Sequence, residues 1–234
     1  MSSTAPPKPS QVSKPLPAPL GILGGTFDPI HVAHLRLAEE ATRQLGLAGI
    51  VWIPAGNPWH RSAPMVSGQH RLAMVRLAIA DHPDHMVDDA EVHSPAPSYT
   101  VPTLERLRRQ HGADRPLVLL MGADAFLGLT TWHRWRDLFR LAHLGVASRP
   151  TFDLVPERMP LELADEFRRR AAPSGALVAA AAGAITRFRL EAGTVSATEV
   201  RHRLRQSTPP DAPLAELLPP AVLDYIRQHR LYLP

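Results

Sequence analysis

The sequence predicts an α/β fold built on a doubly wound parallel sheet. Short apolar runs, typical of strands buried on both faces, alternate along the chain with amphipathic segments at helical spacing. Several of these runs end in glycine or small polar residues that lead into a helical pattern, as parallel strands do where they meet their crossover helices. At 234 residues the chain is long enough to bury a substantial core under such a sheet.

The first predicted strand leads into the most informative stretch of the chain. Leu20–Leu23 is apolar, and Gly24 and Gly25 then permit a sharp turn and the close approach of a ligand. From about His31 the apolar residues recur at helical spacing. A strand–turn–helix junction presents free N–H groups and the positive end of a helix dipole, which favours phosphate. We expect His31 and His34, one helical turn apart, to face this site.

The other predicted elements follow the same alternation. Residues 55–68 form a long loop of the kind that is often functional. We expect Trp52 and Trp135 to lie in the core. Residues 1–19 should form a disordered tail, and the Ala/Gly-rich stretch 171–183 a mobile surface insertion. The remainder is predicted to be one domain over 20–234, with a helical C-terminal part from about 196. Further strands are predicted at 49–54, 86–88, 116–121, 143–148 and 185–188, and helices at 69–80, from 98–100 onward, around 132–135, and at 162–170, 198–206 and 217–228.

Three strand ends are candidates for a shared binding site. The Gly24–Gly25 turn, Gly122–Asp124 and Ser148–Arg149 each follow a predicted strand. In doubly wound sheets ligands bind outside the carboxyl ends of the strands, where the connections diverge. The sequence therefore predicts one pocket at this edge.

Composition narrows the class of protein. The net charge of +4 comes mainly from scattered arginines without a basic–aromatic stripe, which favours small anionic ligands over nucleic acid. The chain has no cysteine, no apolar run of membrane-spanning length and no secretory h-region. These features favour a cytoplasmic protein without a membrane partner, and they leave the oligomeric state open, a homo-oligomer included.

A second cluster lies near the C-terminal end, at Val195–Arg201. Ser196 and Glu199 have the spacing of a capping box, in which Ser196 caps a helix and Glu199 reaches back. A helix start of this kind serves equally well as a cap and as an anion site, so both interpretations stay open.

Both clusters resemble signatures of the nucleotidylyltransferase superfamily. Residues 24–34 are similar to GGTFDPxHxGH, except for Ala33 where the family has Gly, and residues 196–201 are similar to SxTxxR. Ser98–Thr100, Gly122–Asp124 with Thr131–Trp132, and the end of the chain resemble bacterial nicotinate-nucleotide adenylyltransferases. The chain departs from them at Thr151, where Gly often follows Arg-Pro, and at His229–Arg230, where Gly is commonly seen.

The resemblance implies a Rossmann-like nucleotidylyltransferase fold and transfer of the adenylyl group of ATP to nicotinate mononucleotide, with Mg²⁺ entering on ATP and no metal-ligand set in the protein. His34 would stabilise the developing charge, together with His31 and Arg201. The ATP site would comprise Gly24, Gly25, Thr26, Phe27, His31, His34, Gly122, Asp124, Ser196, Thr198 and Arg201, and the mononucleotide site His60, Ser98, Tyr99, Thr100, Trp132 and Arg149.

Other functions remain open at this point. Within the superfamily the acceptor could be nicotinamide mononucleotide or phosphopantetheine. From a different class, the chain could be a non-catalytic nucleotide-binding or nucleic-acid-binding module. Aminoacyl-tRNA synthetases share the paired-histidine element, but this chain is short and has no KMSKS-like lysine loop.

Overall fold

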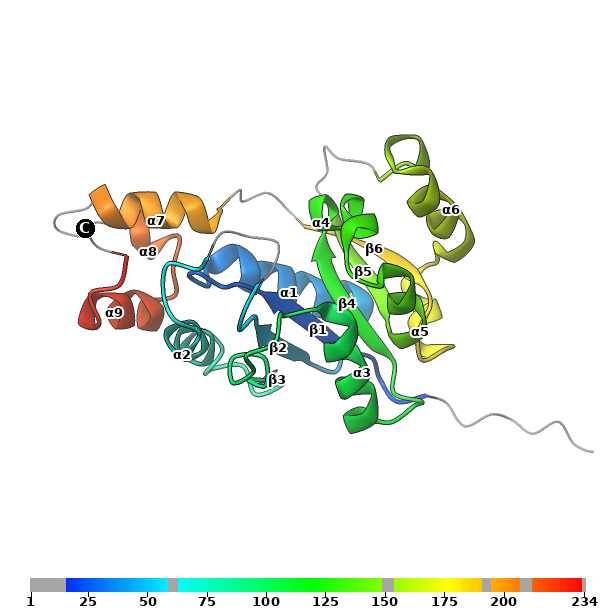
Figure 1. Cartoon of the computed structure of the whole chain (residues 1–234), viewed down its shortest axis with the longest axis horizontal. Coiled ribbons are helices and arrows are strands. Elements are labelled where there is room, and N and C mark those ends of the chain that lie inside the picture. Colours follow the sequence, from blue (N-terminus) through cyan, green and yellow to red (C-terminus); the bar gives the residue numbers. More distant parts are fainter. Residues whose placement is uncertain (1–15, 59–62, 149–153, 191–194, 207–211, 233–234) are drawn as a thin grey trace, which may run out of the picture.

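The computed structural model describes residues 16–58, 63–148, 154–190, 195–206 and 212–232 (Figure 1). Its centre is a six-stranded sheet, parallel throughout, in the order β3-β2-β1-β4-β5-β6. This is the strand order of a doubly wound sheet and confirms the predicted fold class. The strands are β1 (Leu20–Gly25), β2 (Ile50–Pro54), β3 (His85–Val87), β4 (Leu117–Gly122), β5 (His143–Ser148) and β6 (Ile185–Arg189).

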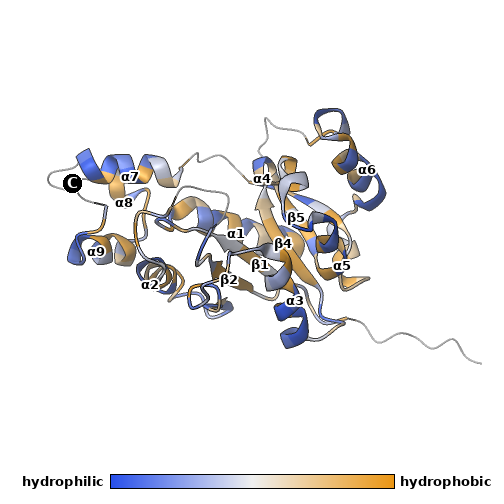
Figure 2. Ribbon diagram, viewed as in Figure 1, coloured by the Kyte–Doolittle hydropathy of each residue, from blue (hydrophilic) through white to orange (hydrophobic). Residues whose placement is uncertain are grey.

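Helices cover both faces of the sheet because successive strand residues point to opposite sides. Ile22 and Leu119 pack with the helices α3 to α6, whereas Leu23 and Leu120 pack with α1, α2 and α7 to α9. In Figure 2 the strands are apolar and the outer surfaces of several helices are hydrophilic. The helices are α1 (Val32–Leu45), α2 (Gly68–Ala78), α3 (Thr100–His111), α4 (Ala123–Leu127), α5 (Leu138–Leu141), α6 (Leu161–Arg170), α7 (Ala197–Gln206), α8 (Ala212–Ala215) and α9 (Pro220–Gln228), with short 3-10 turns η1 (Leu129–Thr131), η2 (Trp135–Asp137), η3 (Pro156–Arg158) and η4 (Ser174–Val178).

Most predicted elements recur with small shifts at their ends, but no single helix carries Trp132 and Trp135: Trp132 lies between the 3-10 turns η1 and η2, and Trp135 begins η2. The last helix begins at Pro220 rather than at residue 217, because the turn of α8 precedes it. Trp52 and Trp135 lie in the core, as expected. The predicted tail lies largely outside the described residues, but its last residue, Pro19, is buried and its carbonyl accepts a hydrogen bond from Ala48 N.

The Ala/Gly-rich stretch 171–183 lies largely at the surface, as predicted, but it is anchored by specific contacts to the sheet. Leu177 is fully buried in the core. The carbonyl of Ala180 lies 2.8 Å from His143 Nε2, and that of Ala181 accepts hydrogen bonds from Arg108 and from Leu117 N. The stretch therefore packs against the start of β4 and β5. Its low side-chain volume allows close packing and does not indicate disorder.

The order of the strands and their connections determines where a binding site can lie. β1 and β4 are neighbours, yet α1 follows β1 on one face of the sheet and α4 follows β4 on the other. The connections diverge between these strands, which opens a crevice beyond their carboxyl ends. Within the described residues, no helix is both long and apolar enough to cross a lipid bilayer.

Candidate functional site

A cavity of about 250 Å³ occupies this crevice, beyond the carboxyl ends of β1, β2 and β4. Its walls are largely apolar, with contributions from Ile53, Leu119 and Met121. Eight of the predicted site residues line it: Gly24, Gly25, Thr26, His34, Ser98, Thr100, Gly122 and Trp132. Phe27, His31, Tyr99, Asp124, Ser196, Thr198 and Arg201 lie outside its lining, and His60 and Arg149 lie outside the described residues.

The glycine turn is shaped by close packing under His34. A Cβ on Gly25 would come within 2.9 Å of the Phe27 ring, so any side chain there would displace that ring. Phe27 has a positive φ of 50° and is only 2% exposed. Its ring meets that of His34 edge-on, with centroids 5.1 Å apart. The Phe27 side chain therefore supports His34 and does not face the cavity.

The two histidines differ in position. His34 lines the cavity, whereas His31 is 5% exposed and stacks on the His34 ring at 3.8 Å. The i, i+3 spacing does bring the two rings together, as expected, but His31 is buried at the N-cap of α1, where its backbone is extended (φ −146°, ψ 170°). Of the two, His34 is the one that belongs to the cavity lining.

Burial lowers the pKa of His31 to about 4, so His31 is neutral at physiological pH. His31 N donates to His34 Nδ1 at 3.2 Å. With Nδ1 accepting, a neutral His34 carries its hydrogen on Nε2. The pair thus presents one oriented imidazole to the cavity, with the second ring buried behind it.

The two signature segments meet in space. Arg201 Nη1 donates to the carbonyl of Asp28 at 2.8 Å, and Arg201 Nη2 donates to Thr198 Oγ1 at 3.2 Å. The expected helix cap is present, because Ser196 Oγ accepts from Glu199 N at 3.1 Å. Glu199 itself bonds to Arg203 Nε at 2.6 Å, so the reciprocal half of the predicted capping box is replaced by an ion pair.

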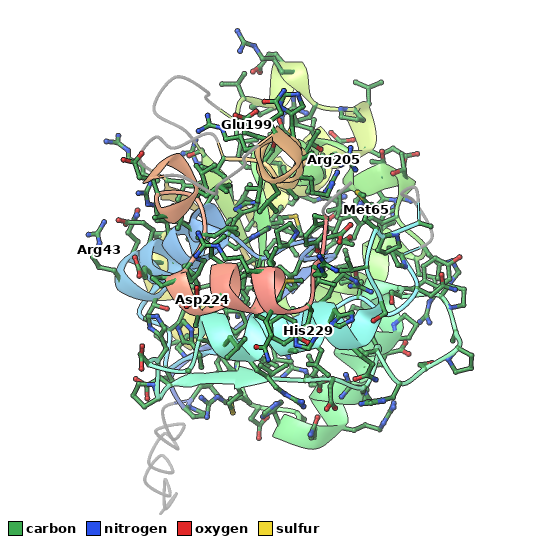
Figure 3. All side chains as sticks on the ribbon, turned by 90° about the vertical axis from the view of Figure 1, so that its left-hand side faces the viewer. Arg43, Met65, Glu199, Arg205, Asp224 and His229 are labelled. Atoms are coloured by element: carbon green, nitrogen blue, oxygen red, sulfur yellow. The ribbon has the colours of Figure 1, made fainter. Side chains whose placement is uncertain are left out.

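Asp28 is a junction that the sequence analysis missed. Its carboxylate accepts hydrogen bonds from Tyr232 OH at 2.7 Å and from Met65 N at 2.9 Å. Asp28 is 6% exposed and Tyr232 is 4% exposed. Burial and the adjacent Asp28 charge raise the pKa of Tyr232, which therefore stays protonated and donates. Met65 also lies beside Arg205 of α7, whose Nη2 is 2.9 Å from Met65 Sδ (Figure 3).

Arg71 supports the same turn from below and was also missed. It is 1% exposed, and it donates to the carbonyls of Thr26 at 2.7 Å and Gly56 at 3.2 Å. Burial lowers the pKa of Arg71 and the nearby Asp28 opposes that shift. The sequence signal for Arg71 was its position inside the apolar face of the predicted helix, directly before Leu72.

The far end of the cavity is closed by the segment before α3. Ser98 exchanges hydrogen bonds with Asn57, through Ser98 N to Asn57 O at 2.9 Å and Asn57 N to Ser98 Oγ at 3.2 Å. Thr100 begins α3, and the half-buried Trp132 stands opposite within the same lining. Tyr99 turns away, its ring 4.7 Å from that of His133.

Glu91 is an acidic residue in the cavity wall that the sequence analysis did not single out. Thr103 Oγ1 donates to Glu91 Oε1 at 2.5 Å. Burial raises the pKa of Glu91. Asp124, by contrast, lies in the first turn of α4 with an exposed side chain, and Gly122 takes the N-cap position before it.

A glycine turn at the switch point of a parallel sheet, with a histidine in the cavity and an arginine brought to the turn from a distant helix, defines a nucleotidylyltransferase type of α/β protein. The model of the cytidylyltransferase-like family matches residues 22–203, and the chain belongs to this family.

Individual proteins are similar to this chain over nearly its whole length. A probable nicotinate-nucleotide adenylyltransferase of Dechloromonas aromatica is 54% identical over 92% of this chain and 97% of its own length. The protein of the same name from Hahella chejuensis is 43% identical over 92% of this chain and 96% of its own. Among solved structures, the nicotinic acid mononucleotide adenylyltransferase of Plasmodium falciparum complexed with NaAD has a TM-score of 0.66 at 17% identity, covering 92% of this chain and 97% of that one, which shows a shared fold.

Proposed function

We propose that this chain transfers the adenylyl group of ATP to nicotinate mononucleotide, giving nicotinate adenine dinucleotide and pyrophosphate in NAD biosynthesis. The observation that carries the proposal is the Arg201–Asp28 contact, which joins the two signature segments beside the cavity that His34 lines. The names of relatives that span nearly the whole chain support the same activity.

The reaction needs little proton transfer from the protein. A mononucleotide phosphate has its second pKa near ~6 and is largely dianionic at neutral pH, so its oxygen attacks the α-phosphorus of ATP without a general base. The bond from that phosphorus to the pyrophosphate oxygen breaks, and negative charge develops on the leaving group. Catalysis therefore rests on alignment and charge stabilisation.

His34 and Arg201 supply those functions at the two sides of the turn. His34 would donate from Nε2 to a phosphate oxygen, because Nδ1 already accepts the His31 backbone N–H. Arg201, with Ser196 and Thr198 at the start of α7, would hold the β- and γ-phosphates. Neutral His31 adds no charge and instead orients His34.

The acidic residues near the turn bear on how a metal ion could take part. Across the described ranges, no group of three or more His, Cys, Asp or Glu side chains is placed to bind an ion. Asp28, the carboxylate nearest to the turn in sequence, is already bonded to Tyr232 and Met65 N. We infer that a Mg²⁺ ion would enter with ATP and would neutralise part of the phosphate charge.

The acceptor would lie at the Ser98–Trp132 end of the cavity. The indole of Trp132 offers a face for the pyridine ring, and the N–H groups at the start of α3 favour a carboxylate over a neutral amide. A role for Tyr99 there would rest on its backbone, since its ring packs on His133. His60, Arg149 and Asp124 stay predictions.

The decisive test is pyrophosphate release with ATP and Mg²⁺, comparing nicotinate and nicotinamide mononucleotides and including a reaction without acceptor. We expect a higher kcat/KM for the acid. A higher value for the amide would refute the choice of substrate. Tight, strongly salt-dependent binding of DNA or RNA without pyrophosphate release would instead favour a nucleic-acid-binding module.

A further inference from the structure

The hydrogen bond between Tyr232 and Asp28 joins the far end of the chain to the phosphate turn. Tyr232 OH lies 2.7 Å from Asp28 Oδ1, across a sequence separation of 204 residues, and both side chains are almost completely buried. A hydrogen bond to a buried carboxylate contributes more to stability than one between neutral groups.

Asp28 connects this bond to the phosphate site. Its second carboxylate oxygen accepts from Met65 N, and its carbonyl accepts from Arg201. The position of the carbonyl that orients the Arg201 guanidinium thus depends on where the Asp28 side chain is fixed. Asp28 also precedes His31 by one short turn, so a shift at Asp28 changes the spacing between Arg201 and the histidine pair.

The backbone before Tyr232 follows an unusual course to make this contact. Arg230 and Tyr232 both have positive φ, at 52° and 63°. A left-handed conformation is unfavourable for residues other than glycine. Leu231 N bonds back to Ile226 O at 3.0 Å, which folds the segment onto the end of α9. Figure 3 shows α9, with Asp224 and His229, on the side of the molecule that faces the viewer.

The aromatic ring and the hydroxyl of Tyr232 contribute separately. The ring belongs to the apolar cluster that also contains Val222 and Ile226, and a phenylalanine would pack there equally well. Only the hydroxyl contacts Asp28. A substitution that removes the hydroxyl alone therefore tests its role without opening a cavity.

We infer that the Tyr232 hydroxyl is a positioning group for the phosphate site: it fixes Asp28 so that the Asp28 carbonyl aims Arg201 at the pyrophosphate end of ATP. This inference rests on the proposed adenylyl transfer for its kinetic readout. Tyr232 touches no substrate, and its effect passes through Asp28.

The test compares Tyr232→Phe with Tyr225→Phe. Tyr225 lies in the same C-terminal segment, and its hydroxyl is 3.0 Å from His70 Nδ1, away from the turn. Both variants lose one hydroxyl hydrogen bond, so both report the general loss of stability. Assays run well below the melting temperature of each variant.

For Tyr232→Phe we expect kcat to fall about tenfold, as for a misaligned phosphate contact, with an unchanged KM for the mononucleotide. The affinity of the Tyr232→Phe variant for the non-reacting analogue α,β-methylene-ATP, measured by calorimetry, should weaken by a similar factor. Tyr225→Phe should match the wild type in all of these values. Because Asp28→Asn already weakens the junction, adding Tyr232→Phe to it should cause little further loss.

If Tyr232→Phe behaves like Tyr225→Phe in both turnover and analogue affinity, the positioning role is wrong. If the wild type releases no pyrophosphate with either mononucleotide, the proposed function fails. The comparison of analogue affinities then still decides the role of Tyr232, because that measurement involves no acceptor.

Discussion

Lowering the pH from 8 to 5 should destabilise this protein through His31. The side chain is 5% exposed at the N-cap of α1, and burial lowers its pKa to about 4. In the unfolded chain the same imidazole has a pKa of about 6.5. Between these values the unfolded state binds a proton that the folded state does not, so stability rises with pH.

The size of the effect follows from the two pKa values. His31 makes its full contribution to the free energy of unfolding above pH ~6.5, and this contribution is lost as the pH falls toward ~4. The loss reaches about 2 kcal/mol at pH 5 and about 3 kcal/mol at pH 4. Burial also lowers the pKa of His85, His111 and His143, which adds to the wild-type pH dependence. A variant lacking only His31 isolates its share.

Urea unfolding at pH 8, 6.5 and 5 measures this share when His31→Asn is compared with the wild type. The wild type should lose about 2 kcal/mol more between pH 8 and pH 5 than the variant does. The absolute stability of the variant at pH 8 is immaterial, because only the two pH dependences are compared. Equal dependences would mean that His31 titrates normally, and the neutral, orienting role given to it would be wrong.

Three further predictions concern the site and its supports. His34→Ala should lower kcat on the order of 10²-fold or more with an unchanged circular dichroism spectrum, as when a transition-state donor is removed, and near-normal turnover would contradict its role. Trp132→Ala should raise the KM for the mononucleotide far more than that for ATP, since the ring stands at the Ser98 end of the cavity, whereas equal increases would indicate packing alone. Arg230→Gly should raise the free energy of unfolding by about 1 kcal/mol in urea titrations, because glycine relieves the left-handed conformation, while the helical control Arg227→Gly should lower it by a similar amount. A loss of stability in Arg230→Gly would show that its backbone is not strained.

The sheet and the turns that follow its strands could be predicted from the sequence. The buried strands, the glycine turn and the cap at Ser196 each depend on residues that are close together in the chain, and the structure contains all of them. The adjacency of His31 and His34 also followed from their spacing, since the N-cap and N3 side chains of a helix are neighbours. The burial of His31 did not, because it depends on the packing around the turn.

The contacts that hold the site together could not be read from local patterns. Tyr232 with Asp28 and Arg71 with Thr26 join segments that are far apart in sequence, and neither pair has a characteristic spacing. The contacts of the stretch 171–183 were missed for a related reason. Alanine and glycine carry little periodicity, yet small residues let the carbonyls of Ala180 and Ala181 approach His143 and Arg108 closely.

The departure at Arg230 from the expected glycine now has a structural meaning. Its φ of 52° lies in the region that glycine occupies without strain. The chain keeps the turn that the glycine would make and retains Tyr232 at its end. With Arg230 in place of the glycine, the hydrogen bond between Tyr232 and Asp28 is therefore still made.

The distance along the chain between Asp28 and Tyr232 has a consequence for synthesis on the ribosome. At about 5–20 residues per second, the 204 residues that separate the two take roughly 10–40 s to translate. During that interval the glycine turn and the histidine pair already exist, but the arginine and the tyrosine that complete their surroundings do not. On a nascent chain, the glycine turn should therefore lack its contacts to Arg201 and Tyr232 until those residues have emerged.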